Sequence, residues 1–280
     1  MLIDFIHLES NHLQNEINLN TLDSISPNPY KQNLNPINST YIPHTFAQVP
    51  ISLDYKRGVK DGVLDKEAIL NQMHSALEII SVHKPNKILT LGGECSCSVA
   101  PFSYLNSIYK DEIALLYLDA HPDITLPYDS YKGFHAMAVT ALLGLGDIDI
   151  INLLPSKIDS KKVLFIGLHS DETKFYAKRQ EELELKSLTL KESKNPKHTL
   201  KWLKKIKAKK VLVHLDLDVL DKKELYVAVG NSGKLKIKHI LKLLDSVSQE
   251  YEIVGLTIAE HFPKELLKLK ELVGRLPLIR

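Results

Sequence analysis

Short apolar runs alternate with segments of helical periodicity along most of the chain. Six runs are continuously apolar, as in strands covered on both faces: Leu2–His7, Lys87–Leu91, Ile113–Leu118, Lys162–Gly167, Lys210–Leu215 and Ile253–Ile258. The periodic segments predict helices over Asp65–Val82, Ser98–Tyr109, Ala136–Leu145, Pro196–Lys207, Ile237–Gln249 and Pro263–Val273. This strand-then-helix order predicts one doubly wound α/β domain over residues 1–280, with a mostly parallel central sheet flanked by helices.

Two segments carry more detailed expectations. In the first predicted helix, apolar side chains such as Ile69, Met73 and Ile80 recur on one stripe, and Asp65 is expected to cap the N-terminus. Residues 24–50 differ, because five prolines lie there among many Asn and Ser residues. This composition predicts a long irregular excursion.

Composition and charge exclude several classes of function. The 280 residues include 36 Lys and Arg against 34 Asp and Glu, a net charge of +2, which lacks the basic excess of a nucleic-acid-binding protein. No apolar run is long enough to span a bilayer, and the start of the chain lacks the features of a secretion signal. The only cysteines, Cys95 and Cys97, fit a reducing compartment, so we expect a cytoplasmic protein without a membrane or nucleic-acid partner.

Polar residues with the chemistry of metal ligands follow the predicted strand Ile113–Leu118. Asp119, His121 and Asp123 alternate there, so in extended backbone their side chains would point to one side. Open α/β sheets bind ligands at the carboxyl ends of their strands. Carboxylate with imidazole suits a transition metal or zinc. A capping Asp beside a solvated His is the alternative for this cluster taken alone.

A second cluster ends the predicted strand Lys210–Leu215. Asp216 and Asp218 alternate with apolar residues, so both are expected to reach the same site. Adjacent carboxylates repel each other unless a cation or a proton lies between them. Together the two clusters predict a pair of metal ions that share carboxylates, an arrangement suited to hydrolysis.

Five motifs, in order, resemble the ureohydrolase family of arginases, agmatinases and formiminoglutamases. They are residues 92–96 (GGECS), similar to G-G-D-H-S; 119–123 (DAHPD), similar to D-A-H-x-D; 133–137 (GFHAM), similar to the stretch with the active-site histidine; 214–221 (HLDLDVLD), similar to S-x-D-x-D-x-x-D; and 258–263 (IAEHFP), similar to E-x-N-P. The resemblance covers about residues 87–263 and implies an arginase-like fold.

The resemblance implies a binuclear metal centre. Asp119 and Asp216 would bridge the ions, Asp123 would complete the first site, and His121 with Asp218 the second. Cys95 stands where the family has a histidine. The family metal is Mn, but a soft thiolate favours Zn, Fe, Co or Ni. Cys95 is either a ligand or a bystander thiol that leaves the first site weak.

The resemblance also assigns catalytic and substrate-binding roles. A hydroxide held by the metals would attack the carbon of a guanidino, amidino or formimino group, and Asp123 would hydrogen-bond to that hydroxide. Glu260 would pair with the cationic group, and His135 would relay protons. Thr125 takes the place of an Asn that holds the substrate's tail in arginases, and Asp171 or Glu172 would meet its amino group.

The expected function is therefore metal-dependent hydrolysis of a C–N bond in a linear amidine, with release of urea or a related product. The alternative is a catalytically inactive family member that acts as a ligand-binding or oligomeric partner protein. Cys95 and the absence of the family's G-T-G-T-P stretch motivate that alternative. The resemblance further implies a small guanidino or amidino substrate and a homo-oligomer, either a trimer or a hexamer.

Overall fold

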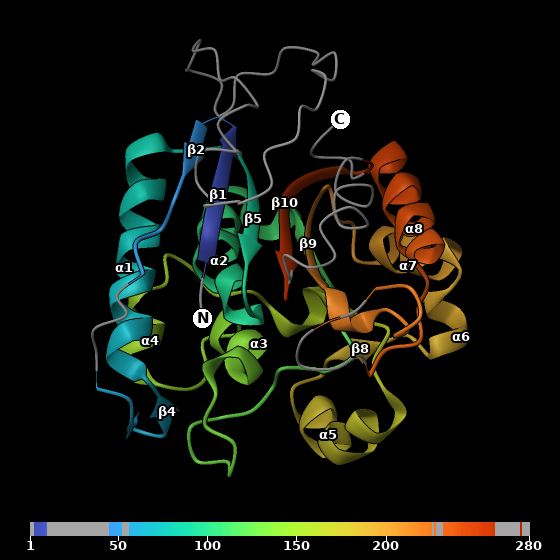
Figure 1. The fold of residues 1–280 in the computed structure, drawn as a ribbon. Coiled ribbons are helices and arrows are strands. Elements are labelled where there is room, and N and C mark those ends of the chain that lie inside the picture. Colours follow the sequence, from blue (N-terminus) through green and yellow to red (C-terminus); the bar gives the residue numbers. More distant parts are fainter. Residues whose placement is uncertain are drawn as a thin grey trace, which may run out of the picture.

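The computed structural model describes residues 3–9, 45–51, 56–225, 227, 232–260 and 275. Its main sheet has eight strands in the order β2-β1-β5-β10-β9-β6-β7-β8 (Figure 1). Their bounds are β1 Ile3–Glu9, β2 Thr45–Ala47, β5 Lys87–Gly92, β6 Ile113–Leu118, β7 Val163–Ile166, β8 Lys186–Ser187, β9 Lys210–Asp216 and β10 Glu252–Ala259. The strands from β5 to β8 in this order run parallel, whereas β1 is antiparallel to both neighbours. The mostly parallel sheet is thus confirmed.

Helices cover both faces of the sheet (Figure 1). On one face lie α1 (Lys66–His83), α2 (Val99–Tyr109), α3 (Ala138–Leu142), α4 (Ile148–Leu153) and α5 (Ser170–Glu182). On the other lie α6 (Leu190–Ser193), α7 (Pro196–Lys205) and α8 (Ile237–Glu250). A small hairpin, β3 (Val59–Lys60) with β4 (Val63–Leu64), precedes α1.

The strand β6 shows why the predicted strands are continuously apolar. Ile113, Leu115 and Tyr117 pack into the core beneath α1–α5. The intervening residues, Ala114, Leu116 and Leu118, pack into the core beneath α7 and α8. Because successive side chains in a strand point to opposite faces, a sheet covered on both sides needs apolar residues at every position.

The predicted helices differ from the observed ones mainly at their ends. Over Ala136–Leu145 the chain first forms a 3₁₀ turn, Phe134–Met137, and α3 ends shortly before Gly144, whose φ is +77°. The apolar pattern does not predict three of the helices, namely the short α4 and α6 and the longer α5. The predicted helix Pro263–Val273 lies outside the described residues. So does most of the predicted excursion at residues 24–50, of which 45–47 form β2.

The N-terminus of α1 corrects one expectation. The predicted stripe is confirmed, since Ile69, Met73 and Ile80 are buried. Asp65, however, does not cap the helix with its side chain; it adopts a φ of 56°, and its carboxylate accepts a hydrogen bond from the Gly58 N–H at 3.0 Å. The left-handed backbone turns this carboxylate back toward the preceding hairpin. Within the described part of the chain, no helix is both long and apolar enough to cross a membrane.

Candidate metal centre

The carboxyl ends of three neighbouring parallel strands bring acidic residues together. The register pairs Leu118 of β6 with Leu215 of β9, and Asp216 of β9 with Ala259 of β10. Asp119 and Glu260 each follow directly after these strands. Segments about 45 to 140 residues apart in sequence therefore meet at one edge of the sheet.

One group of potential metal ligands consists of Cys95, Asp119, His214 and Asp216. Their ligand atoms all lie within 4.8 Å of one another, and all four residues are buried. The Cys95 thiol donates a hydrogen bond to Oδ2 of Asp216 at 2.9 Å and lies 3.7 Å from Oδ2 of Asp119. Cys95 reaches this position because a 3₁₀ turn, Cys95–Ser98, begins just after β5.

A second group consists of Asp119, His121 and Asp218. Nδ1 of His121 lies 2.8 Å from Oδ2 of Asp218 and 3.6 Å from Oδ1 of Asp119. The predicted convergence of these residues is confirmed, but the predicted cause is wrong. β6 ends just before Asp119 and β9 ends at Asp216, and each of these aspartates accepts a hydrogen bond from the backbone N–H two residues on, at 2.7 Å. These local turns, rather than extended backbone, aim His121 and Asp218 at the site.

Glu260 completes a third group with Asp216 and Asp218. Its φ of 60° turns the chain sharply at the end of β10. Oε2 of Glu260 is buried and has no hydrogen-bond partner among the described residues. Burial, followed by the charges of Asp216 and Asp218, raises the pKa of Glu260 to about 10.

The electrostatics of the centre fit a divalent cation. Burial and the neighbouring carboxylates raise the pKa values of Asp119 and Asp216 well above their ordinary range. Burial, and then the nearby carboxylates, also raises the pKa of the Cys95 thiol. Buried acids in such close contact must either bind protons or share a cation. The thiol, imidazole and carboxylate donors belong to the ligand types of Zn and related metals.

Asp123 lies at the wall of the same site but outside these three groups. The chain turns at Asp123 with a φ of 48°, and Oδ2 accepts a hydrogen bond from the Tyr117 hydroxyl at 2.7 Å. Burial raises the pKa of Asp123, while the bond from Tyr117 opposes the rise. The structure therefore places this carboxylate in a fixed orientation beside the Cys95 thiol.

A cavity of about 480 Å³ opens onto the centre, and Asp123, His135 and Glu260 all line it. Nδ1 of His135 lies 3.4 Å from Oε2 of Glu94, and Nε2 lies 2.8 Å from the Tyr131 hydroxyl. Burial lowers the pKa of His135, but the hydrogen bond and charge of Glu94 outweigh it and produce a net rise. His135 is thus held between a carboxylate and a hydroxyl.

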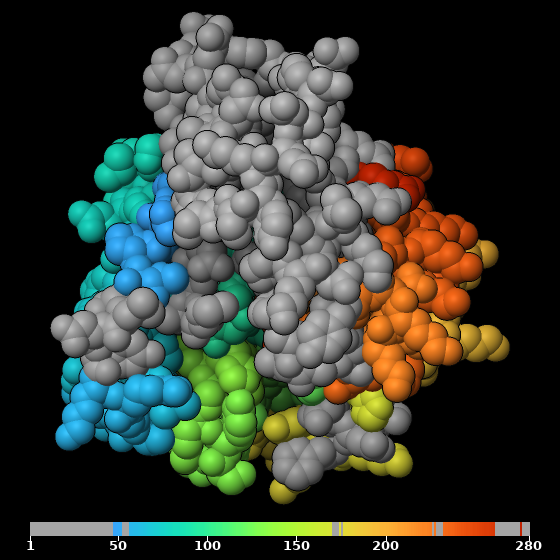
Figure 2. Space-filling view, in the orientation of Figure 1, coloured from blue at the N-terminus to red at the C-terminus, as the bar shows by residue number. Residues whose placement is uncertain are grey.

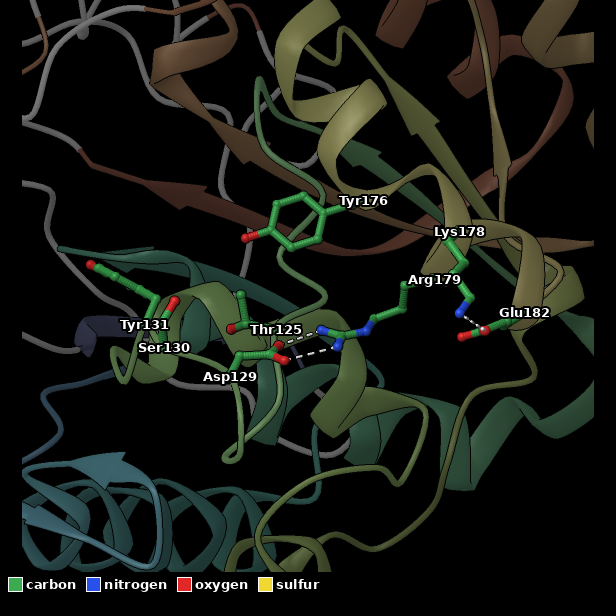
Figure 3. A pocket seen from close by; sticks show the side chains of 8 residues that line it. All are labelled: Thr125, Asp129, Ser130, Tyr131, Tyr176, Lys178, Arg179 and Glu182. Atoms are coloured by element: carbon green, nitrogen blue, oxygen red, sulfur yellow. Dashed lines mark hydrogen bonds and ion pairs between the residues drawn. The ribbon is translucent and has the colours of Figure 1, made fainter.

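A second pocket, of about 360 Å³, adjoins this cavity and shares Thr125, Tyr131 and Tyr176 with it (Figure 3). Arg179 crosses this pocket to pair through both guanidinium branches with Asp129. The loop that carries the exposed Tyr128 and Tyr131, drawn in light green, lies at the molecular surface (Figure 2).

Of the three further residues predicted to bind the substrate, Thr125 lies at the cavity, and Asp171 and Glu172 lie in α5. Thr125 lines the cavity, but its hydroxyl donates to the Ala136 carbonyl at 2.7 Å, so only its oxygen remains available as an acceptor. Asp171 and Glu172 lie in the first turn of α5, and their side chains are outside the described residues.

His214 is a member of the centre that the sequence motifs do not single out as a ligand. It stands only as the first residue of the motif at residues 214–221. The available signal was its spacing, because His214 and Asp216 are two residues apart on one strand and share a face.

The sequence of the chain is similar to a family model and to several known proteins. The model of the Arginase family matches residues 19–266. Arginase 1, mitochondrial, of Arabidopsis thaliana is 23% identical over 74% of this chain and 56% of its own length. An arginase of Entamoeba histolytica is 26% identical over 30% of each chain. The chain thus spans less than two thirds of these relatives.

Solved structures show the same fold. The structure of Entamoeba histolytica arginase in complex with L-ornithine is similar with a TM-score of 0.67 and 16% identity, over 79% of each chain. Arginase from Bacillus caldovelox gives 0.66 and 20%, over 78% of this chain and 76% of that one. A putative agmatinase from Clostridium difficile gives 0.57 and 19%, over 81% and 75%.

Proposed function

The chain belongs to the arginase family, and on that premise we propose that it is a metal-dependent hydrolase that cleaves a C–N bond in a guanidino, amidino or formimino compound. The observation that carries the proposal is the overlap of three groups of ligand side chains at one strand edge, with Asp119, Asp216 and Asp218 each shared between two groups. Shared carboxylates are typical of centres with two ions.

Two divalent ions at this centre would lower the pKa of a water molecule to about 7 and so supply a nucleophile at neutral pH. Asp119 and Asp216 are the proposed bridging residues, with His121 and Asp218 as the remaining ligands of the second ion. Nδ1 of His121 lies 2.8 Å from Oδ2 of Asp218, so the two side chains are close enough to contact one ion. Mn is the metal of the family, while Cys95 favours Zn, Fe, Co or Ni.

Glu260 is the proposed anchor for the substrate's cationic group. Its unpartnered Oε2 is available to accept a hydrogen bond from a planar guanidinium or amidinium group. Such a charge-assisted pair needs a carboxylate. Cations bound at Asp216 and Asp218 would cancel the charges that raise the pKa of Glu260, and would thereby favour its ionised form.

Asp123 and His135 are the proposed proton-handling residues. The hydrogen bond from Tyr117 fixes one oxygen of Asp123, which leaves the other to accept a hydrogen bond from the attacking nucleophile. His135 can pass a proton to the leaving nitrogen while Glu94 stabilises the imidazolium form. Tyr131, on the other side of the ring, holds its orientation.

The substrate's tail is proposed to extend past Thr125 into the adjoining pocket of Figure 3. The paired charges of Arg179 and Asp129 there can interact with a polar tail. Asp171 or Glu172 is the proposed partner for an amino group on that tail. The Entamoeba histolytica structure contains L-ornithine, an amino acid that has both an amino group and a carboxylate.

The proposal is tested by analysing the metal content of the purified protein and its release of urea or ammonia. The chain, supplied in turn with Mn, Co, Ni, Fe or Zn, is expected to bind a divalent ion and to hydrolyse one member of a panel of guanidino and formimino compounds. No bound ion and no product under any condition would favour the inactive family member. We also propose a cytoplasmic homo-oligomer of single-domain chains, which light scattering and cell fractionation would test.

A further inference from the structure

A buried histidine lies against the proposed metal-binding carboxylates although the family motif has serine at this place. His214 is fully buried in β9, two residues before Asp216 and on the same face of the sheet. Nε2 of His214 lies 3.8 Å from Oδ2 of Asp119. Its ligand atom is also within 4.8 Å of the Cys95 thiol and the Asp216 carboxylate.

The polar atoms of His214 have no partner that would explain their burial. Neither ring nitrogen makes a hydrogen bond to any described residue. Thr257, the cross-strand neighbour of His214 on β10, has an equally unpartnered hydroxyl. Burial of unpaired polar groups is unfavourable, so such groups usually bind something that the folded chain alone does not provide. A metal-bound imidazole normally donates its second N–H to a nearby oxygen, and the hydroxyl of the neighbouring Thr257 has no other partner among the described residues.

Packing explains only part of why a histidine is buried at position 214. The imidazole stacks on the ring of Tyr117, with centroids 4.1 Å apart and planes 8° from parallel. Stacking fixes the plane of the ring, and a phenyl ring would stack equally well. It does not explain two nitrogens at a cluster of acids, so the choice of histidine requires another cause.

We propose that His214 is a metal ligand and supplies the imidazole that position 95 lacks, so that Cys95, His214, Asp119 and Asp216 together bind one ion. This inference rests on the proposed function, because it concerns the same centre. Tetrahedral zinc with bonds of about 2.0–2.3 Å separates its ligand atoms by about 3.3–3.8 Å. The observed separations of 2.9, 3.7 and 3.8 Å need only small adjustments to fit. The mixed S, N and O set selects Zn or Co over Mn.

The direct test compares Zn²⁺ affinity, measured by chelator competition, among the unmodified protein, His214→Phe and His74→Phe. Phenylalanine keeps the stacking on Tyr117 but cannot bind metal. We expect His214→Phe to bind Zn²⁺ more weakly than the unmodified protein, with a dissociation constant at least about 100-fold higher. His74 is exposed on α1, and its variant should bind Zn²⁺ like the unmodified protein. Unchanged affinity in a folded His214→Phe protein would overturn the inference while leaving the proposed function intact.

A second measurement needs no variant at position 214. In protein labelled with ¹⁵N-histidine, Zn²⁺ should move two imidazole signals into the range of metal-bound nitrogen, one from His121 and one from His214. Movement of the His121 signal without that of His214 would overturn the inference. If the unmodified protein binds none of the five ions Zn²⁺, Co²⁺, Mn²⁺, Ni²⁺ and Fe²⁺, the proposed function fails together with it.

The double variant Cys95→His with His214→Ser returns the imidazole to the family's position. We expect this exchange to recover Zn²⁺ affinity relative to His214→Ser alone and to raise affinity for Mn²⁺ above that of the unmodified protein. The Co²⁺-loaded unmodified protein should also show a thiolate-to-cobalt absorption band that the double variant lacks. If His214→Ser binds Zn²⁺ as tightly as the unmodified protein does, there is no loss of affinity for Cys95→His to recover. That result would contradict the role of His214.

Discussion

At the scale of single residues, the protonation state of a side chain at the strand ends decides what that side chain can bind. Cys95 is protonated when no ion is present, because burial and the surrounding acids raise its pKa. Its thiol therefore serves as a donor to Asp216. The thiol donates a hydrogen bond, whereas only the deprotonated thiolate can bind a metal ion. Metal binding by Cys95 must therefore release a proton.

Asp123→Asn is expected to lower turnover by at least about 100-fold while leaving the fold and metal content nearly unchanged. Asparagine still accepts the hydrogen bond from Tyr117, but it cannot take up a proton from the nucleophile. Steady-state kinetics and thermal unfolding would measure the two effects. Tyr117→Phe, which frees the carboxylate without removing it, should cause a smaller loss. Full activity in Asp123→Asn would refute the assigned role.

Glu260→Gln is expected to raise KM by about 10- to 100-fold, because an amide keeps the shape of the side chain but loses the charge that pairs with a cationic group. The measurement is KM and kcat for the preferred guanidino or amidino substrate. Glu67→Gln, at an exposed position on α1, is the matched control and should behave like the unmodified protein. An unchanged KM in Glu260→Gln would contradict substrate pairing at this residue.

Sequence reasoning identified most of the candidate centre, since motif spacing marks strand ends and strand ends meet in a parallel sheet. Asp119, His121, Asp216 and Asp218 do converge. The turns that aim them were not predictable from the apolar pattern, because they depend on single hydrogen bonds from the backbone N–H two residues on to Asp119 and Asp216. His214 was missed because a histidine inside an apolar strand is ordinarily a packing residue, and only the fold shows what its nitrogens face.

At the scale of elements, the predicted strands match the observed ones to within two residues, because burial on both faces imposes an unambiguous apolar pattern. Helices α4 and α6 are 6 and 4 residues long, too short for a helical period to stand out. Their ends depend on local capping: Asp147 accepts from the N–H groups of Asp149 and Ile150, and Thr189 forms a capping box with Glu192. Such contacts are specified by a few residues rather than by a pattern.

The packing of α2 on the sheet depends on a glycine in β10. A Cβ atom at Gly255 would lie 2.6 Å from Leu212, 2.9 Å from Leu105 and 3.2 Å from Phe102. Gly255→Ala is therefore expected to lower the free energy of unfolding by about 1–3 kcal/mol. Chemical denaturation measures the effect. Gly58→Ala, where nothing lies within 4 Å of the added atom, should change stability much less. Equal stability of the two variants would show that α2 adjusts freely.

At the scale of the whole molecule, the buried acids and imidazoles of the centre tie stability to pH. In the folded chain without metal, the pKa of Glu260 is about 10 instead of 4.5. Burial lowers the pKa of His121, but Asp119 and Asp218 outweigh it and raise the value to about 12 from 6.5. Above pH 6.5 the unfolded chain has lost these protons while the folded chain retains them, so stability must fall as pH rises.

His214 acts in the opposite direction but in a separate range. Burial lowers its pKa to about 3, so its contribution to stability is complete above pH 6.5 and is lost only as the pH falls toward 3. Between pH 6.5 and 9 the groups with raised pKa values therefore act alone. The melting temperature of chelator-treated protein is expected to decrease steadily over this interval.

Protein loaded with Zn²⁺ is the matched comparison for this prediction. Bound cations replace the retained protons and neutralise the same carboxylates, and ligands bind metal more tightly once deprotonated. The difference in melting temperature between loaded and chelator-treated protein should accordingly widen from pH 6.5 to pH 9. A chelator-treated protein whose melting temperature stays constant or rises over that interval would mean that the acids at the ends of β6, β9 and β10 are ionised without a cation, and the electrostatic case for a metal centre would fail.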